Sequence, residues 1–272
     1  MDARTSRYHD VYSHWQRNPE VFWSEAAAEI DWYEKPKKIF DKDAGVYGRW
    51  FTDGVVNTCY NAVDRHVACG RNNQAALIYD SPVSGEKRTI TYSRLLSEVQ
   101  LLGAMLSDFG VGKGDRVIIY MPMVPEAIFA MLACARIGAI HSVVFGGFAA
   151  KELATRIDDA KPKVILSASC GLGGARVIPY KPLLDEAIKL AQHKPAACAI
   201  LQRPQCEAPL VAGRDHDWRR CWSTRSITPR PAIACRSPLP IRSISSTPPA
   251  PPGCRKAWCA TTAATWSRSN GR

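Results

Sequence analysis

Two adjacent glycines, Gly146 and Gly147, are the residues best placed to serve a ligand directly. They stand between an apolar segment that predicts a buried strand and a segment with helical spacing. In parallel α/β sheets, ligands approach the carboxyl ends of the strands, where glycine lets a ligand contact the backbone closely. The following helix would add free N–H groups and the positive end of its dipole. The same pattern also fits a tight strand-to-helix turn that binds nothing.

A second glycine cluster, Gly171 to Gly174, also follows an expected strand. It suggests a dinucleotide-binding loop, but Arg176 occupies the third glycine position of that motif, and no acidic residue follows at the required spacing. The segment by itself indicates a flexible loop. A dehydrogenase that used it would bind NAD, which we do not expect. Arg176 is of interest because a guanidinium group binds phosphate well.

The sequence offers no catalytic or metal-ligating constellation. His66, His141 and His193 are far apart, and no serine or cysteine stands in a strained elbow motif, so a catalytic triad is not supported. The cysteines before residue 219 form no CxxC pair and show no zinc-ligand spacing. We therefore name no catalytic residue and no metal ligand.

Three features of the sequence bear on location. No stretch of about eighteen apolar residues occurs, so a membrane span is not expected. The N-terminal residues lack the apolar centre of a secretory signal. Cysteines without a pairing pattern indicate buried thiols in a reducing compartment. The sequence thus predicts a cytoplasmic protein.

The elements that must position the glycines alternate regularly from Gln74 onward. Short apolar runs predict strands, amphipathic runs predict helices, and alternation of the two indicates an α/β fold with a parallel sheet flanked by helices. The expected strands are 75–79, 89–92, 116–120, 141–145 and 163–167, and the expected helices are 93–110, 125–137, 149–160 and 182–192. The aromatic-rich residues 1–62, with a helix expected at 20–30, are too irregular for a core of their own and should wrap a neighbouring domain.

The composition changes abruptly after Trp218. Residues 219–272 contain ten of the 36 Lys and Arg but none of the 25 Asp and Glu, together with eight of the 19 Pro. Residues 1–218 are therefore close to neutral, and the net charge of +11 comes almost entirely from the tail. We expect three parts: 1–62 as a cap segment, 63–218 as a partial nucleotide-binding domain, and 219–272 as an unstructured tail.

Several segments resemble the AMP-forming acetyl- and propionyl-CoA synthetases, a family of adenylate-forming ligases. The resemblance covers Tyr8 to about Trp218 and is closer to the propionyl-CoA branch. Its most diagnostic stretch is Ile140 to Phe148. The other matching segments are 56–66, 76–82, 89–92, 115–123, 133–139, 156–160 and 178–187.

The resemblance implies an acid–thiol ligase. Such enzymes use ATP, with Mg²⁺, to convert a short-chain carboxylate such as propionate or acetate into acyl-AMP, and then transfer the acyl group to coenzyme A. By the same resemblance, Gly146, Gly147 and Arg176 would help to hold coenzyme A. The family's loop often carries a further arginine, which Leu172 to Arg176 lacks. A small-molecule substrate is the expected partner, with no nucleic acid and no membrane, and the oligomeric state stays open.

The family's phosphate loop, similar to Tyr-Thr-Ser-Gly-Thr-Thr-Gly, is absent from the protein as written, yet its coding is compatible with the tail. When the third base of each codon is joined to the first two bases of the next, every junction from Ser246 to Cys254 admits the next family residue. Agreement continues through Trp266, and the junction of Trp258 with Cys259 can give only Val. Each other junction allows few residues, so chance agreement over this length is not expected.

We therefore infer that the reading frame slips near Arg219 to Cys221 and that the tail is an out-of-frame translation of the ATP-binding region. Such a chain would be a truncated form without ligase activity. The alternative is a genuine basic, Pro-rich arm that binds nucleic acid or an SH3-like partner. In that case the chain would be a non-catalytic nucleotide- or coenzyme A-binding fragment with a tail that docks a partner.

Overall fold

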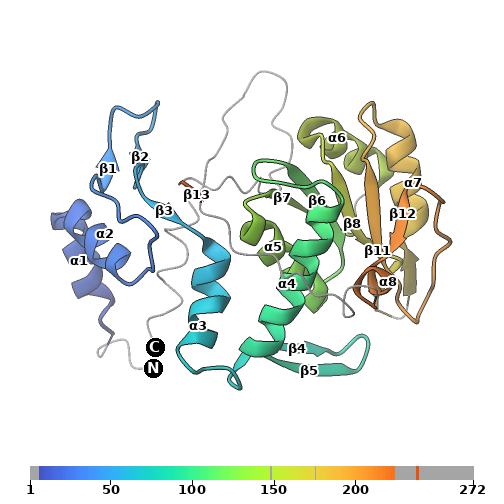
Figure 1. Ribbon diagram of the computed structural model, residues 1–272, viewed down its shortest axis with the longest axis horizontal. Coiled ribbons are helices and arrows are strands. Elements are labelled where there is room, and N and C mark those ends of the chain that lie inside the picture. The colour runs from blue at the N-terminus through green and yellow to red at the C-terminus, as the bar shows by residue number, and fades with distance from the viewer. Residues whose placement is uncertain (1–5, 148, 175, 224–236, 239–272) are drawn as a thin grey trace. The chain divides into compact units, whose positions relative to one another are not determined.

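Five parallel strands form the sheet that carries the candidate site (Figure 1). The computed structural model describes residues 6–147, 149–174, 176–223 and 237–238. The strand order is β12-β11-β8-β6-β7, and every neighbouring pair is parallel. These strands are β6 (Arg116–Met121), β7 (Ile140–Phe145), β8 (Val164–Ala168), β11 (Ala197–Leu201) and β12 (Asp215–Asp217).

The strand order reverses at β6. The chain passes from β6 to β7 on one side, and then returns to the other side of β6 for β8, β11 and β12. If the five strands are numbered 1 to 5 along the chain, starting with β6, their order across the sheet is 2-1-3-4-5, a doubly wound arrangement. At the point where this order reverses, a crevice opens between the loops that follow β6 and β8. The carboxyl edge of β6 and β8 is therefore the place where a ligand is expected.

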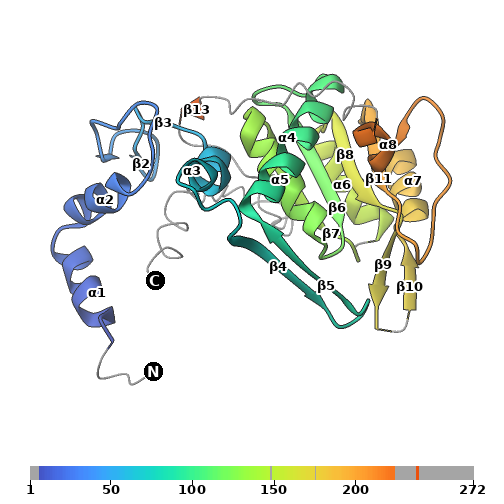
Figure 2. The ribbon, with the colours of Figure 1, turned by 60° about the horizontal axis from the view of Figure 1, so that its bottom comes forward.

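Helices cover both faces of the sheet (Figure 2). On one face, α4 (Tyr92–Asp108) and α5 (Pro125–Ile137) pack against Val117, Ile119 and the other residues of that face. On the other face, α6 (Ala150–Ala160) and α7 (Tyr180–Leu190) pack against Ile118 and the alternating residues. Because side chains alternate across a strand, strands buried on both faces are apolar throughout. The predicted α/β fold, with a parallel sheet flanked by helices, is confirmed.

Local sequence signals set the helix ends. The side chain of Thr91 accepts a hydrogen bond from the backbone N–H of Arg94 at 3.3 Å and so caps α4. Pro125 occupies the first turn of α5, and Gly138 ends it with a left-handed φ of 75°. Observed bounds differ from the expected ones by at most two residues, except at the start of the strand expected at 89–92, which begins three residues earlier, at Glu86.

Other elements flank the sheet. The expected strands near 75–79 and 89–92 are present, but they form a separate antiparallel hairpin of β4 (Ala75–Ser81) and β5 (Glu86–Thr91). A π-helical turn (Tyr60–Asp64) leads into α3 (Arg65–Ala68). The last described helix is α8 (Trp218–Ser223), and Trp218 is buried in the core beside α4 and α5. β11 and β12 are strands that the sequence analysis did not anticipate.

A buried ion pair ties the π-helical turn to α5. Both terminal nitrogens of Arg136 donate to the carboxylate of Asp64, at 2.7 and 2.9 Å, and Arg136 is buried. The Sγ atom of Cys59 lies 3.6 Å from the same guanidinium group. Bidentate geometry makes this a strong charge-assisted contact. It fixes the entry of the chain into the sheet-bearing part.

Residues up to Asn57 belong to a separate compact unit. It contains α1 (Tyr8–Arg17), α2 (Pro19–Ala28), and the two-residue strands β1 (Phe40–Asp41), β2 (Arg49–Trp50) and β3 (Val55–Val56). Its small core is aromatic, built on Phe51 with Trp32 and Trp50 packed around it. The helix expected at 20–30 is α2.

The predicted unstructured tail lies largely outside the described residues. Of 219–272, the structure describes 219–223, which end α8, and β13 (Ser237–Pro238), which pairs antiparallel with β3. Within the described part, no helix is both long and apolar enough to cross a membrane.

Replacing Arg136 by leucine should lower the free energy of unfolding by about 3–5 kcal/mol, because the carboxylate of Asp64 loses its partner in a largely buried site. Lys87→Ala is the control, since its pair with Asp80 is exposed and should contribute less than about 1 kcal/mol. Urea denaturation measures both. Equal losses in the two variants would contradict the role given to Arg136.

Candidate functional site

Gly146 and Gly147 lie directly after β7, at the carboxyl edge of the sheet, and α6 begins three residues later. Gly146 is buried and Gly147 is exposed. This is the strand–turn–helix setting that the sequence analysis expected for these residues. Their role in binding coenzyme A remains a prediction.

Packing in the structure requires glycine at position 146. A Cβ atom built there would lie 2.5 Å from Cζ of Tyr180, closer than real Cβ contacts allow. A Cβ on Gly147 would lie 2.7 Å from Cε1 of Phe145, an exposed ring with room to turn away. The missing side chain of Gly146 therefore makes room for Tyr180 from within the protein. Gly147, in contrast, is exposed to solvent.

The second glycine cluster is part of a hairpin, so the predicted flexible loop is wrong. β9 (Cys170–Gly173) pairs antiparallel with β10 (Arg176–Pro179) immediately after β8. A dinucleotide-binding loop runs from a strand into a helix, whereas this segment turns back into a strand. Ladder pairing of Gly171 with Ile178 satisfies backbone groups that a free loop would leave to water.

Arg176 is exposed at the tip of this hairpin, opposite Gly173. Two ladder positions separate it from the pair Gly171–Ile178, which corresponds to ~7 Å along the strand. A cation placed there can reach a phosphate in solvent at the carboxyl edge of the sheet.

Tyr180 brings the two glycine segments together, and the sequence analysis did not single it out as a site residue. A Cβ atom on Gly171 would also lie 2.5 Å from Cζ of Tyr180. The buried ring of Tyr180 packs on Tyr120, with centroids 5.2 Å apart. Burial raises the pKa of both tyrosines, that of Tyr120 to about 12, so both rings are neutral. The local sequence around Tyr180 does not predict its contacts with Gly146 and Gly171, because these contacts depend on the order of the strands in the sheet.

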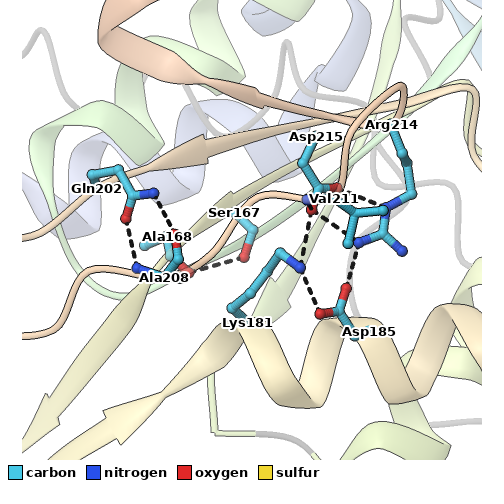
Figure 3. A network of polar contacts seen from close by, with 9 residues as sticks. All are labelled: Ser167, Ala168, Lys181, Asp185, Gln202, Ala208, Val211, Arg214 and Asp215. Atoms are coloured by element: carbon cyan, nitrogen blue, oxygen red, sulfur yellow. Dashed lines mark hydrogen bonds and ion pairs between the residues drawn. The ribbon is translucent and has the colours of Figure 1, made fainter.

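Next to Tyr180, Lys181 anchors α7 through a buried polar network (Figure 3). Its Nζ atom lies 2.5 Å from Asp185 and 3.0 Å from Asp215. Arg214 contacts both carboxylates, with Nε 2.6 Å from Asp215. The backbone N–H of Val211 donates to Asp215 at 2.9 Å. Two cations thus neutralise two carboxylates between α7 and β12.

The network sets the charge state of Asp215. Burial alone would raise the pKa of this carboxyl, but hydrogen bonds from Arg214, the Val211 N–H and Lys181 hold it below the ordinary 3.8. Desolvation and the neighbouring Asp215 raise the pKa of the Cys198 thiol to about 12. Cys198 is therefore a neutral, buried side chain rather than a nucleophile.

The three histidines lie in different elements and have separate surroundings. The Nδ1 atom of His66 lies 3.0 Å from Arg71, and Nε2 of His193 lies 2.8 Å from the Pro162 carbonyl oxygen. Burial lowers the pKa of His141, on β7, to about 4. Over the described ranges, no group of three or more His, Cys, Asp or Glu is placed to hold a metal ion.

A cavity of ≈ 910 Å³ lies beyond the carboxyl end of β11, beside β12. Residues of both charges line it, together with apolar ones: Gln202, Pro204, Glu207, Ala208, Leu210, Asp215, His216, Asp217, Arg219 and Arg220. The sequence analysis missed this cavity because its lining comes from irregular segments without a motif.

Two family models match the chain. Residues 8–62 match the acetyl-coenzyme A synthetase N-terminus, and residues 64–234 match the AMP-binding enzymes. The chain belongs to the AMP-binding enzyme family. The resemblance to short-chain acyl-CoA synthetases is thereby confirmed, and the glycine turn and the hairpin both lie in the AMP-binding part.

Curated relatives agree with this family. The chain is 52% identical to an uncharacterized protein of Pseudomonas aeruginosa, covering 86% of this chain and 37% of that protein. It is 52% identical to the human mitochondrial acyl-CoA synthetase short-chain family member 3, covering 74% and 29%. It is 46% identical to the propionate–CoA ligase of Salmonella typhimurium, covering 78% and 33%. The chain thus spans about a third of the length of these relatives.

A solved structure supports the fold. Acetoacetyl-CoA synthetase from Streptomyces lividans matches with a TM-score of 0.72 at 21% identity, over 83% of this chain and 34% of that one. At this identity the match shows the fold alone.

Lys181→Met should lower the free energy of unfolding by about 3–5 kcal/mol, because it leaves Asp215 buried without one of its cations. Lys189→Met is a matched control on the same helix, where the lysine is exposed, and should change stability by no more than about 0.5 kcal/mol. Urea denaturation of both variants measures these free energies. A loss of stability in Lys189→Met as large as that in Lys181→Met would contradict the stabilising role of the buried network.

The contribution of Asp215 should depend on pH. Because its pKa in the folded state lies below the ordinary 3.8, its stabilisation is fully present well above 3.8 and is lost as the pH falls through the folded value. The stability difference between the wild-type chain and Asp215→Asn should therefore be constant from pH 7 to 5 and shrink toward pH 3. Urea midpoints at each pH measure this.

Proposed function

We propose that this chain carries the opening part of a short-chain fatty acid–CoA ligase. Enzymes of this kind use ATP to convert propionate or acetate into acyl-AMP and then pass the acyl group to coenzyme A. The observation that carries the proposal is a glycine turn and an arginine-tipped hairpin, gathered by Tyr180 at the reversal point of the sheet in a member of the AMP-binding family. Similarity to a propionate–CoA ligase supports the propionate branch.

In this proposal, Gly146, Gly147 and Arg176 hold coenzyme A. The exposed guanidinium of Arg176 binds a phosphate of the cofactor, and the backbone at Gly147 contacts the chain on its open side. These residues bind and orient the thiol substrate. We assign none of them a part in proton transfer, since the nearby tyrosines stay neutral.

The adenylation half-reaction requires a binding site for ATP. A triphosphate is held by backbone N–H groups of a Gly-, Ser- and Thr-rich loop. The codons of residues 246–266 are compatible with such a loop in a shifted frame, and these residues lie outside the described part of the chain. The described residues offer no carboxylate cluster that fits Mg²⁺, so no step is derived through it.

We infer that the frame slips near Arg219 to Cys221 and that the chain as written lacks ligase activity. Support comes from the acid-free composition of 219–272 and from the codon junctions of 246–266. The match to AMP-binding enzymes ends at residue 234, ahead of those junctions. A dehydrogenase is disfavoured, because the glycine cluster that would bind NAD is a β-hairpin.

A reducing compartment such as the cytoplasm fits this function. All six cysteines of residues 1–218 are free thiols in the structure, and Cys59, Cys134, Cys170 and Cys198 are fully buried. Thiols persist in this form where glutathione and thioredoxin keep them reduced.

The purified chain should form no acyl-hydroxamate from propionate, ATP, Mg²⁺ and hydroxylamine, because no loop holds the triphosphate. The control is the same gene with the frame restored near codon 220, which should form the hydroxamate. Product from the chain as written would contradict the inactivity. No product from the restored protein would contradict the ligase assignment itself.

Resequencing the locus across codons 215–225 tests the frame slip directly. We expect an insertion or deletion there, relative to a frame that continues into the phosphate loop. An uninterrupted open frame that encodes 219–272, with no ligase-like code in another frame, would favour a genuine basic arm. Titration with coenzyme A would then test the chain as a binding module.

A further inference from the structure

The two candidate segments for coenzyme A are not neighbours in the sheet. The turn at Gly146 follows β7, the hairpin with Gly171 and Arg176 follows β8, and β6 lies between these strands. Adjacent strands are ~4.8 Å apart, so the two segments start about 10 Å from each other. Each of β7 and β8 pairs with β6, but in the described part of the chain no ladder joins the two segments to each other.

The ring of Tyr180 spans this distance. The hydroxyl oxygen and Cζ of Tyr180 lie against the Cβ positions of both glycines, with Cε2 on the Gly146 side and Cε1 on the Gly171 side. The hydroxyl-bearing end of one ring thus fits between two glycines from different segments. A side chain on either glycine would push the corresponding segment away from the ring, because 2.5 Å leaves no room for a Cβ atom.

Several contacts hold Tyr180 in place. Its backbone N–H donates to the Ser169 carbonyl oxygen at 3.0 Å, and its ring packs on Tyr120 of β6. The hydroxyl of Ser169 accepts a hydrogen bond from the backbone N–H of Arg203 at 2.9 Å. Lys181, the next residue, is fixed by Asp185 and Asp215. A rigid ring on a fixed backbone is suited to set a spacing.

We propose that Tyr180 is a positioning residue that sets the distance between the Gly146–Gly147 turn and the Arg176 hairpin, and so determines the geometry of the coenzyme A site. The assignment of that site rests on the proposed function. The spacing role itself rests on the packing of Tyr180 between Gly146 and Gly171 and can be tested without coenzyme A. It also explains why both positions are glycine.

A double-mutant cycle on the full chain tests the packing. Gly146→Ala should lower the urea midpoint in the wild-type background, and should cost clearly less when Tyr180→Leu has removed the far end of the ring. Gly112→Ala is the control, because a Cβ there meets only Asp115, at 3.8 Å, and should cost the same in both backgrounds. Additive losses for Gly146 and Tyr180 would overturn the proposal.

Amide hydrogen exchange separates positioning from general stability. In Tyr180→Leu, the amides at 146–147 and 171–173 should exchange faster, while those of β8 (Val164–Ala168) keep their protection. Tyr180→Phe keeps the ring but removes the hydroxyl that lies against both glycines, so it should accelerate exchange in these segments less than Tyr180→Leu does. Uniform acceleration that includes β8 would mean a merely structural role and would overturn the proposal.

Coenzyme A titration by calorimetry connects the spacing to binding. Where the wild-type chain binds coenzyme A, Tyr180→Leu should weaken that binding by about tenfold, or about 1.4 kcal/mol. Tyr180→Phe, which keeps the ring without its hydroxyl, should weaken it less. Unchanged affinity in Tyr180→Leu would overturn the role in the site. If the wild-type chain binds no coenzyme A, the site assignment fails in this chain, and the cycle and the exchange experiment still decide the role of Tyr180.

Discussion

Parallel pairing of β6 with both β7 and β8 is the constraint on which the candidate site depends. Because β7 and β8 both run parallel to β6, on its two sides, the loops that follow them lie at the same edge of the sheet. The pairing brings them near each other but leaves a gap the width of one strand. Tyr180 fills that gap, and so the fold creates a site whose dimensions one side chain sets.

The charged network beside Tyr180 shows how the protein holds that side chain. Lys181 and Arg214 face Asp185 and Asp215. The side chains of Lys181 and Asp215 are buried, and an unpaired charge on either would be costly. Removing two charges from water offsets much of their attraction, so such a network contributes geometry more than net stability. Here it joins α7 to the edge strand β12. The start of α7, and with it Tyr180, cannot shift without breaking these contacts.

The amino-acid composition of the chain changes after Trp218. Before it, apolar alternation, helix caps and buried thiols agree with one another, as expected of a chain selected to fold. After it, Asp and Glu are absent while Pro and Arg accumulate. Trp218 is still part of the hydrophobic core. The change in composition therefore begins next to a residue that the fold buries.

The sequence by itself determined α5 and the buried strands β6, β7 and β8, because periodicity and caps act locally: α5 follows from Pro125 and Gly138, and these strands follow from their apolar runs. It did not reveal β11 and β12. It also placed Gly146 at a strand end. It misread Gly171 to Gly174 as a loop, since glycines alone do not reveal a hairpin partner. Only the tertiary structure decided that Tyr180 packs against both glycines and that Lys181 is buried. Those contacts join residues from different strands, and strand order is a property of the whole sheet rather than of any one segment.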